Sequence, residues 1–190
     1  EGNVVTDQFS VKTQAGQLSI AKRDVTLTSA TDSKPYDGKA LTNSEVTVSG
    51  DGFVGEEGAT YSVTGSQTIV GSSENYFTYE LKPGTKAENY NIKTQNGTLT
   101  VTNRDAKYEI TVVANSGGDK YDGSEQSVSG LVTDTFTVNG ETFKVEGLTA
   151  EAKATDAGTY PVNVTGIPVV KDAEGNVVTD QFSVKTQAGQ

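Results

Sequence analysis

Hydrophobic and polar residues alternate in short runs along most of the chain, and no segment keeps the spacing of an amphipathic helix over several turns. Val25–Ser29 and Tyr108–Ala114 have the two-residue period of a half-buried strand. Such runs are rich in Val, Ile and Thr and are separated by Gly, Asn and Asp, which is typical of strands and turns. The pattern predicts an all-β protein with roughly seven short strands in each stretch of roughly 85–90 residues, the range of an immunoglobulin-like β-sandwich.

Two Asn-Gly pairs mark expected hairpins, since this dipeptide is the strongest short-range hairpin signal. One hairpin joins Tyr90–Thr94 to Thr98–Thr102, and the other turns at Asn139-Gly140. Only Lys86–Asn89 fits a helical turn, and a longer helix packed across a sheet there would favour the alternative, β-grasp-like modules. Further strands are expected over residues 45–49, 60–64, 68–70, 76–81, 126–132, 135–138, 142–146, 151–154, 160–165 and 177–185.

The chain repeats itself on two scales. In the long repeat, residues 1–17, EGNVVTDQFSVKTQAGQ, return unchanged as residues 174–190. In a weaker, short repeat within it, KPYDG at Lys34–Gly38 corresponds to DKYDG at Asp119–Gly123, and QFSVKTQAGQLSIAKRD at Gln8–Asp24 corresponds to NYNIKTQNGTLTVTNRD at Asn89–Asp105. Repetition of one unit serves length or valency more often than a single active site. Two small tandem modules in an elongated arrangement are therefore predicted.

The repeats also predict the module boundaries. Residues 23–104 form the first β module and residues 105–190 form the second, which lacks its last strand. Residues 1–22 are expected to be the closing hairpin of a preceding module. A sheet that lacks a strand exposes unpaired N–H and C=O groups along its edge. We therefore expect Gln17–Lys22 of one molecule to complete the second module of its neighbour, head to tail, by edge pairing.

Composition excludes several function classes. The chain has 15 Lys and Arg against 25 Asp and Glu, a net charge of −10, which repels phosphate backbones and anionic lipid headgroups. Nucleic acid is therefore not expected as a partner, and no apolar run is long enough for membrane insertion. The absence of Cys and His removes thiol nucleophiles, thiolate metal sites and the usual general base. The sequence predicts a protein that is not an enzyme and needs no cofactor.

Two motifs are interpreted as structural. In Tyr36-Asp37-Gly38 and Tyr121-Asp122-Gly123, glycine supplies a positive φ, aspartate caps the turn and tyrosine covers the edge of the core. The segment from Asp156 through Gly158 and Tyr160 to Val162 is similar to the D-x-G-x-Y-x-C stretch of immunoglobulin-like domains. There the tyrosine hydroxyl bonds back to nearby backbone. The first module has only a poor match, Ser72-Ser73-Glu74-Asn75-Tyr76.

Two further groups of residues are weaker candidates for ligand binding. Asp172, Glu174 and Asn176 alternate oxygen-bearing side chains as some calcium loops do, but the remaining ligands of an EF-hand are missing. A solvated turn is the preferred interpretation. Tyr76, Phe77 and Tyr79 are candidate ligand-contact aromatics, because strand alternation cannot bury all three on one face.

The KPYDG and DKYDG turns, the DAGTYPV stretch and the NYNIKTQNGTLTV pattern together resemble the YDG and MBG families of bacterial surface-protein repeats. The resemblance implies a secreted, cell-surface or cell-wall protein of a Gram-positive bacterium, with its anchor outside this sequence. It also implies a role as a stalk or adhesin. It supplies no catalytic or ligand-binding residue.

A structural stalk that projects a terminal binding domain is the expected function. The junction at Asn103–Asp105 has no Gly, Ser or Pro linker, so bending between modules should be limited. The expected partners are then neighbouring repeats of the same protein. The alternative is a repeat that itself binds host glycan or protein and gains avidity from its copies.

Overall fold

Strands make up nearly all of the regular secondary structure in the computed structural model, which describes residues 1–190. The only helices are three single 3-10 turns, η1 (Thr6–Gln8), η2 (Ala87–Asn89) and η3 (Thr179–Gln181). The predicted all-β class is therefore confirmed. No helix is long and apolar enough to cross a membrane.

Strand pairing divides the fold into two groups, with no ladder between them. The first strand group contains the sheets β3-β1-β7, β2-β8-β5 and β4-β6. Its strands are β1 (Arg23–Ser29), β2 (Asp32–Pro35), β3 (Val46–Gly50), β4 (Ala59–Val63), β5 (Gly71–Asn75), β6 (Phe77–Leu81), β7 (Tyr90–Gln95) and β8 (Gly97–Thr102). The second strand group contains the sheet β10-β12-β11, with β13 also paired to β12, and the pair β14-β9. Its strands are β9 (Tyr108–Val113), β10 (Gln126–Ser129), β11 (Thr135–Val138), β12 (Glu141–Ala154), β13 (Val164–Lys171) and β14 (Phe182–Gln187).

The first and last segments of the first strand group run side by side in parallel. Arg23 is paired with Tyr90 at the start of β1 and β7, and Asp32 is paired with Leu99 in β2 and β8. The two pairs have the same separation in sequence, so one register holds along the whole length while the chain passes from one sheet to another. The second strand group begins with the same parallel arrangement, in which Tyr108 of β9 is paired with Phe182 of β14.

The expected hairpin between Tyr90–Thr94 and Thr98–Thr102 is wrong. β7 and β8 do not pair with each other, because β7 pairs with β1 while β8 pairs with β2 and β5. Gly97 is buried, and a Cβ atom at this position would overlap the carbonyl oxygen of Ala30. The glycine therefore allows two backbones to approach closely, which is a role that the dipeptide signal does not distinguish from a turn.

The second Asn-Gly pair does form the predicted hairpin, between β11 and β12, with φ of 53° at Asn139 and 81° at Gly140. β12 is one strand of 14 residues where the sequence pattern predicts two. A register irregularity between Glu146 and Leu148 takes up the interruption at Gly147. The strands expected over 68–70 and 160–165 lie instead at β5 and β13.

Three clusters of buried residues form the core. Val25, Leu27 and Tyr90 form a small cluster in the first strand group, and Ala114, Ala150 and Val162 form one in the second. The largest cluster has 11 buried residues and draws on both groups. It contains Tyr36, Leu41, Leu99, Val101, Ile110, Val112, Phe143, Val145, Val170, Val178 and Phe182.

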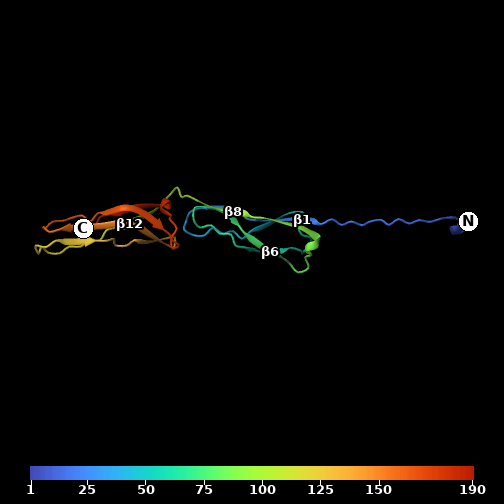
Figure 1. Ribbon diagram of the computed structural model, residues 1–190, viewed down its shortest axis with the longest axis horizontal. Helices are drawn as coiled ribbons and strands as arrows, with labels where there is room; N and C mark the ends of the chain where they lie inside the picture. The colour runs from blue at the N-terminus through green and yellow to red at the C-terminus, as the bar shows by residue number, and fades with distance from the viewer.

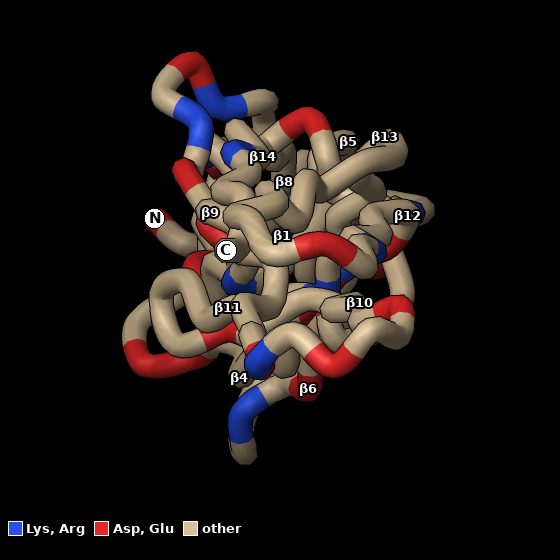
Figure 2. Tube along the Cα trace, turned by 90° about the vertical axis from the view of Figure 1, so that its left-hand side faces the viewer, with Lys and Arg blue, Asp and Glu red and all other residues tan.

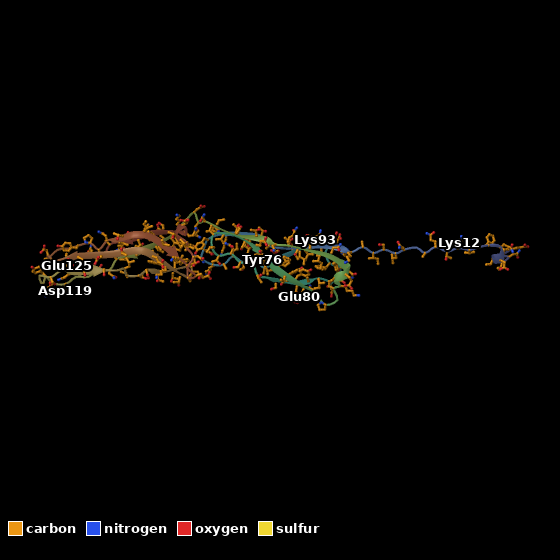
Figure 3. All side chains as sticks on the ribbon, in the orientation of Figure 1. Lys12, Tyr76, Glu80, Lys93, Asp119 and Glu125 are labelled. Atoms are coloured by element: carbon orange, nitrogen blue, oxygen red, sulfur yellow. The ribbon has the colours of Figure 1, made fainter.

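The molecule is elongated, with the two strand groups end to end along its long axis (Figure 1). Residues 1–22 join no ladder and are exposed. This N-terminal segment continues the axis beyond β1 (Figure 1). Lys12 in this segment and Asp119 in the second strand group consequently lie near opposite ends of the molecule (Figure 3).

Candidate functional site

The largest core cluster lies at the junction between the two strand groups, and Tyr36 of the first Tyr-Asp-Gly turn is part of it. The Tyr36 side chain is 0% exposed. It belongs to the same cluster as Phe143 of β12 and Phe182 of β14, whose ring centroids are 4.9 Å apart. Tyr36 therefore lies inside the core and not at its edge, and that core also contains residues of the second strand group.

The rest of this turn also contacts the second strand group. Gly38 has a φ of 82°, and a Cβ atom at this position would lie 3.0 Å from Cζ of Phe143. The side chain of Asp37 accepts a hydrogen bond from the Lys39 amide at 2.9 Å, so it caps the turn as predicted. The carbonyl oxygen of Asp37 accepts a hydrogen bond from Nδ2 of Asn139 at 3.2 Å. The β11–β12 hairpin is thereby connected directly to the turn.

Arg104 and Gln181 fix the segment that connects the two strand groups. Nη1 of Arg104 donates to the Tyr36 carbonyl oxygen at 3.0 Å, and its guanidinium carbon lies 4.1 Å from the centre of the Tyr108 ring. The buried side chain of Gln181 accepts from the Arg104 amide at 2.9 Å and donates to Oδ1 of Asn103 at 2.7 Å. The linker is therefore held by hydrogen bonds on both sides. The sequence did not single out Gln181, because a buried glutamine that forms such hydrogen bonds and an exposed glutamine on a surface strand have the same sequence pattern.

The electrostatics of the junction follow from burial beside acidic groups. Burial, together with the negative charges of Asp172 and Asp37, raises the pKa of Tyr36 to about 12. Its hydroxyl oxygen is buried and has no hydrogen-bond partner. Burial also acts to raise the pKa of Asp37, but hydrogen bonds from Lys34 and from the Lys39 amide outweigh it and lower that pKa. Lys34 and Asp37 form an ion pair of 2.9 Å.

The second Tyr-Asp-Gly turn has the same local geometry in a different environment. Gly123 has a φ of 81°, and Oδ1 of Asp122 accepts from the Ser124 amide at 2.8 Å. The Tyr121 side chain is 66% exposed, whereas its counterpart Tyr36 is fully buried. The expectation that Tyr121 covers the edge of the core is therefore wrong, and the turn forms without the contacts that bury Tyr36.

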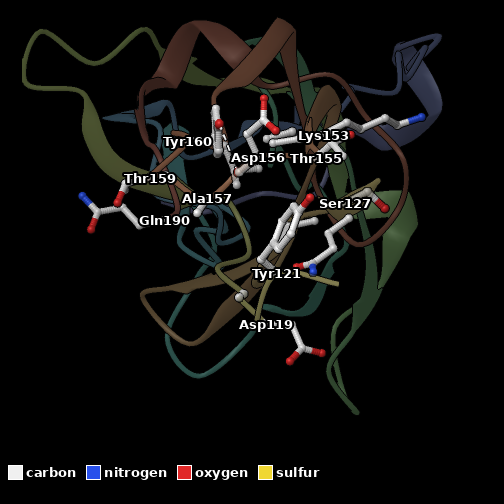
Figure 4. A pocket seen from close by; sticks show the side chains of 18 of the residues that line it. Asp119, Tyr121, Ser127, Lys153, Thr155, Asp156, Ala157, Thr159, Tyr160 and Gln190 are labelled. Atoms are coloured by element: carbon white, nitrogen blue, oxygen red, sulfur yellow. Dashed lines mark hydrogen bonds between the residues drawn. The ribbon is translucent and has the colours of Figure 1, made fainter. Parts of the chain in front are cut away.

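A groove of about 840 Å³ opens beside this second turn. The backbone of Gly117–Tyr121 lies along one side, and the segment from Gly158 to Val162 lies along the other. Strand β12 contributes Ala152 and Ala154 to the lining, and Gln190 stands at one end. Figure 4 shows the groove with Tyr121 and Tyr160 among its labelled side chains.

The Asp156–Val162 segment has the local contact that the motif suggested. The Tyr160 hydroxyl donates to the Asp156 carbonyl oxygen at 3.2 Å, the bond that Figure 4 marks, and Val162 is buried. The strand register gives a different match in the first strand group from the one expected. Val162 bridges Gly189 where Asn75 pairs with Gly97, so Asn75 takes the place of Val162. By that register, Ser73 and not Tyr76 corresponds to Tyr160.

The weaker calcium candidates lie in one turn. Both carboxylate oxygens of Asp172 accept hydrogen bonds, from the Glu174 amide at 3.0 Å and from the amide and side chain of Asn176 at 2.8 and 2.9 Å. This is the geometry of a capped turn. The structure brings together no group of three or more acidic side chains that could hold a metal ion.

Of the three candidate aromatics, Phe77 and Tyr79 lie in β6, and Tyr76 lies between β5 and β6. Phe77 and Tyr79 are partly buried against the core cluster of the first strand group, whereas Tyr76 is 58% exposed. A hydrogen bond from Tyr76 to Glu74, and the negative charge of that residue, raise the pKa of the Tyr76 hydroxyl. Tyr76, which lies in the first strand group (Figure 3), is therefore the only aromatic of this run that is well exposed.

Charged residues are spread around the outer loops and strands (Figure 2). Acidic residues outnumber basic ones, and the end view gives no continuous basic face. Exposed ion pairs such as Lys185 with Glu109 at 2.8 Å contribute little to stability. Comparisons with family models, with curated proteins and with solved structures give no match for this chain.

Proposed function

We propose that this chain is a non-catalytic structural spacer, made of two small immunoglobulin-like β-sandwich modules in tandem. The modules are the two strand groups, with boundaries near 23–104 and 105–190. The parallel pairing of the first strand with a late one in each group supports this assignment, as does the absence of any helix longer than one turn.

The observation that carries the proposal is the shared core at the junction. A junction that buries apolar side chains from both sides resists bending, because each bend exposes them to water. Tyr36 and Phe143 belong to one cluster, and Arg104 links the connecting segment to the turn that holds Tyr36. Modules joined in this way extend the reach of whatever stands at the end of the array.

Small-angle scattering tests the spacer role. The native chain should give the distance distribution of a stiff rod. A variant with a short Gly-Ser insertion between Ala106 and Lys107 should give a broader distribution, because the insertion separates the two sides of the junction. An equal insertion after Gly84, in an exposed loop of the first strand group, is the control and should leave the distribution unchanged. A native chain as flexible as the junction variant would refute the proposal.

The resemblance to YDG and MBG repeats supports a place on the surface of a Gram-positive bacterium, in an adhesin whose binding domain lies elsewhere. Direct binding of host glycan or protein has less support. A sugar site needs stacked or converging aromatics, and of Tyr76, Phe77 and Tyr79 only Tyr76 is well exposed. A glycan array probed with the chain would reveal binding by the repeat itself.

A further inference from the structure

We propose that Asn139 is a site of spontaneous chemical modification, at which loss of the side-chain nitrogen as ammonia weakens the contact between the two strand groups. The chemical step follows from the exposed Asn139-Gly140 turn and is independent of the spacer role. Its mechanical consequence rests on the shared core at the junction, which also supports that role. The only other reactant is water.

The reaction is an attack of a backbone nitrogen on the side chain that precedes it. The Gly140 nitrogen forms a bond to Cγ of Asn139, the bond from Cγ to Nδ2 breaks, and Nδ2 leaves as ammonia with the proton of the Gly140 amide. The product is a cyclic imide. Water then adds to one of its ring carbonyl carbons, opens the ring and returns a proton to the Gly140 nitrogen. An aspartate or an isoaspartate is left at position 139, and nothing is oxidised or reduced.

The sequence offers two places for this reaction, because only Asn96 and Asn139 precede a glycine. Glycine favours the attack, since it has no Cβ atom to crowd the nitrogen and restricts the backbone least. The backbone N–H must also be free, because its proton has to leave and the nitrogen has to turn toward the side chain. The sequence alone does not separate the two sites.

The structure protects Asn96. Gly97 is buried, and its amide donates to Oγ of Ser29 at 2.9 Å. A Cβ atom at Gly97 would overlap the Ala30 carbonyl oxygen, so the backbone there has no room to turn. Ring closure at Asn96 therefore requires local unfolding of the sheet β2-β8-β5.

The other pair, Asn139 and Gly140, forms the turn between β11 and β12, and both residues are exposed. The Gly140 amide has no hydrogen bond, and a Cβ atom at Gly140 would meet nothing within 4 Å. The restraint falls instead on the leaving group, because Nδ2 of Asn139 donates to the Asp37 carbonyl oxygen at 3.2 Å and to Oη of Tyr108 at 2.7 Å. The folded chain therefore directs the reaction to Asn139.

The same hydrogen bonds connect the β11–β12 hairpin to the junction. Asp37 belongs to the first strand group, whereas Tyr108 belongs to the second and has the Arg104 guanidinium over its ring. A carboxylate at position 139 has no N–H to donate, so it would face the Asp37 carbonyl oxygen as a second acceptor. The Tyr108 hydroxyl can turn and donate to that carboxylate. The loss therefore falls on the contact between the strand groups.

The modification also adds a negative charge where carboxylates already gather. The charges of Asp37, Glu141 and Asp172 all act on the buried Tyr36 hydroxyl, which places them around the junction. A further carboxylate is repelled by these charges. In the isoaspartate product the backbone also passes through an additional carbon atom, which changes the geometry of a turn with φ of 53° and 81°. Both products therefore weaken the junction.

Mass spectrometry of tryptic peptides tests the site. Residues 121–144 form one such peptide with Asn139 as its only asparagine, and Asn96 lies in residues 94–104. After incubation of the folded chain at mildly alkaline pH, deamidation should be at least about 10-fold faster at Asn139 than at Asn96, since Asn96 reacts only after local unfolding. In urea the two rates should lie within about threefold of each other, because both asparagines then precede an unrestrained glycine.

The variant Asn139→Asp carries the carboxylate from the start and tests the consequence. Asp-Gly supports the same type of turn, so the hairpin should form and the circular dichroism spectrum should be unchanged. The urea midpoint of this variant should fall, and its scattering distance distribution should broaden. Asn163→Asp is the control, because it makes the same charge change at an exposed asparagine beside the smaller core cluster of the second strand group. Its midpoint and distribution should match those of the native chain.

Two results would overturn the proposal. A folded chain in which Asn139 is not deamidated, or is deamidated no faster than Asn96, would remove the site. An Asn139→Asp variant with the urea midpoint of the native chain would remove the consequence. Failure of the spacer role alone has a different signature. The native chain and both variants would then share one broad distance distribution, while the selective deamidation and the lower midpoint of Asn139→Asp would remain and support the proposal.

Discussion

Replacing Tyr36 with phenylalanine should stabilise the protein, although Tyr36 lies at the centre of the junction. The side chain is fully buried, and its hydroxyl oxygen has no hydrogen-bond partner. An unpaired buried hydroxyl costs about 1–3 kcal/mol relative to water, while the ring contacts remain in phenylalanine. We expect the free energy of unfolding to rise by about 1–2 kcal/mol. In urea this is a midpoint increase of about 0.5–1 M.

Tyr108→Phe is the matched control, because its hydroxyl lies at the same junction but is paired. Oη of Tyr108 accepts a hydrogen bond from Nδ2 of Asn139 at 2.7 Å. Its removal should lower the free energy of unfolding by about 0.5–1.5 kcal/mol. The two Tyr→Phe substitutions should thus have opposite signs in the same assay. A Tyr36→Phe variant less stable than the native chain would refute the account of the junction.

High pH gives an independent measure of the same residue. The pKa of Tyr36 is about 12 in the folded chain and about 10 when unfolded. Between these values the unfolded state releases a proton that the folded state keeps, so stability falls as pH rises from 10 to 12. The native chain should lose up to about 3 kcal/mol more than Tyr36→Phe across this window. Parallel stability curves for the two proteins would contradict this.

Three further substitutions test the backbone and the linker. Gly38→Ala should destabilise the folded protein by about 1–2 kcal/mol more than Gly123→Ala. Both glycines have a positive φ, but only at Gly38 would the added Cβ meet a ring of the other strand group. Equal losses of unfolding free energy in urea would contradict the contact. Gly97→Ala should cost more than about 3 kcal/mol, whereas Gly118→Ala, with nothing within 4 Å, should change the midpoint little. Arg104→Ala should broaden the scattering distance distribution while secondary structure by circular dichroism is kept; an unchanged distribution would show that the guanidinium does not hold the junction.

The features that could be predicted from the sequence are those set by neighbouring residues. Alternation in Val25–Ser29 gives a strand with Val25 and Leu27 inside, whatever it pairs with. The turn at Asn139-Gly140 forms as expected because the two residues supply the positive φ values themselves. The Tyr-Asp-Gly turns follow for the same reason, since the capping carboxylate and the glycine are adjacent.

The features that could not be predicted depend on distant partners. The sequence pattern places Gly97 in a turn. Its role is set instead by its close approach to the backbone of Ala30, which is far from it in sequence. The pattern also places Tyr36 at a core edge, but nothing nearby in sequence indicates that Phe143 and Phe182 belong to the same cluster. β12 continues through Gly147 because β13 pairs with it on both sides of the irregularity. The short repeat is an exception, because it relates two residues that are far apart in sequence, Tyr36 and Tyr121.

The parallel register of the first strand group has a mechanical consequence. The chain enters at Arg23, the first residue of β1, and leaves at Thr102, the last residue of β8, and the segments Arg23–Pro35 and Tyr90–Thr102 lie side by side in one register. A pull on the two ends draws these segments in opposite directions along their length. Every hydrogen bond between them is then loaded at the same time, in shear, whereas a hairpin pulled open would lose its bonds one by one. The chain therefore meets tension along its axis with two parallel ladders loaded together, β1–β7 and β2–β8.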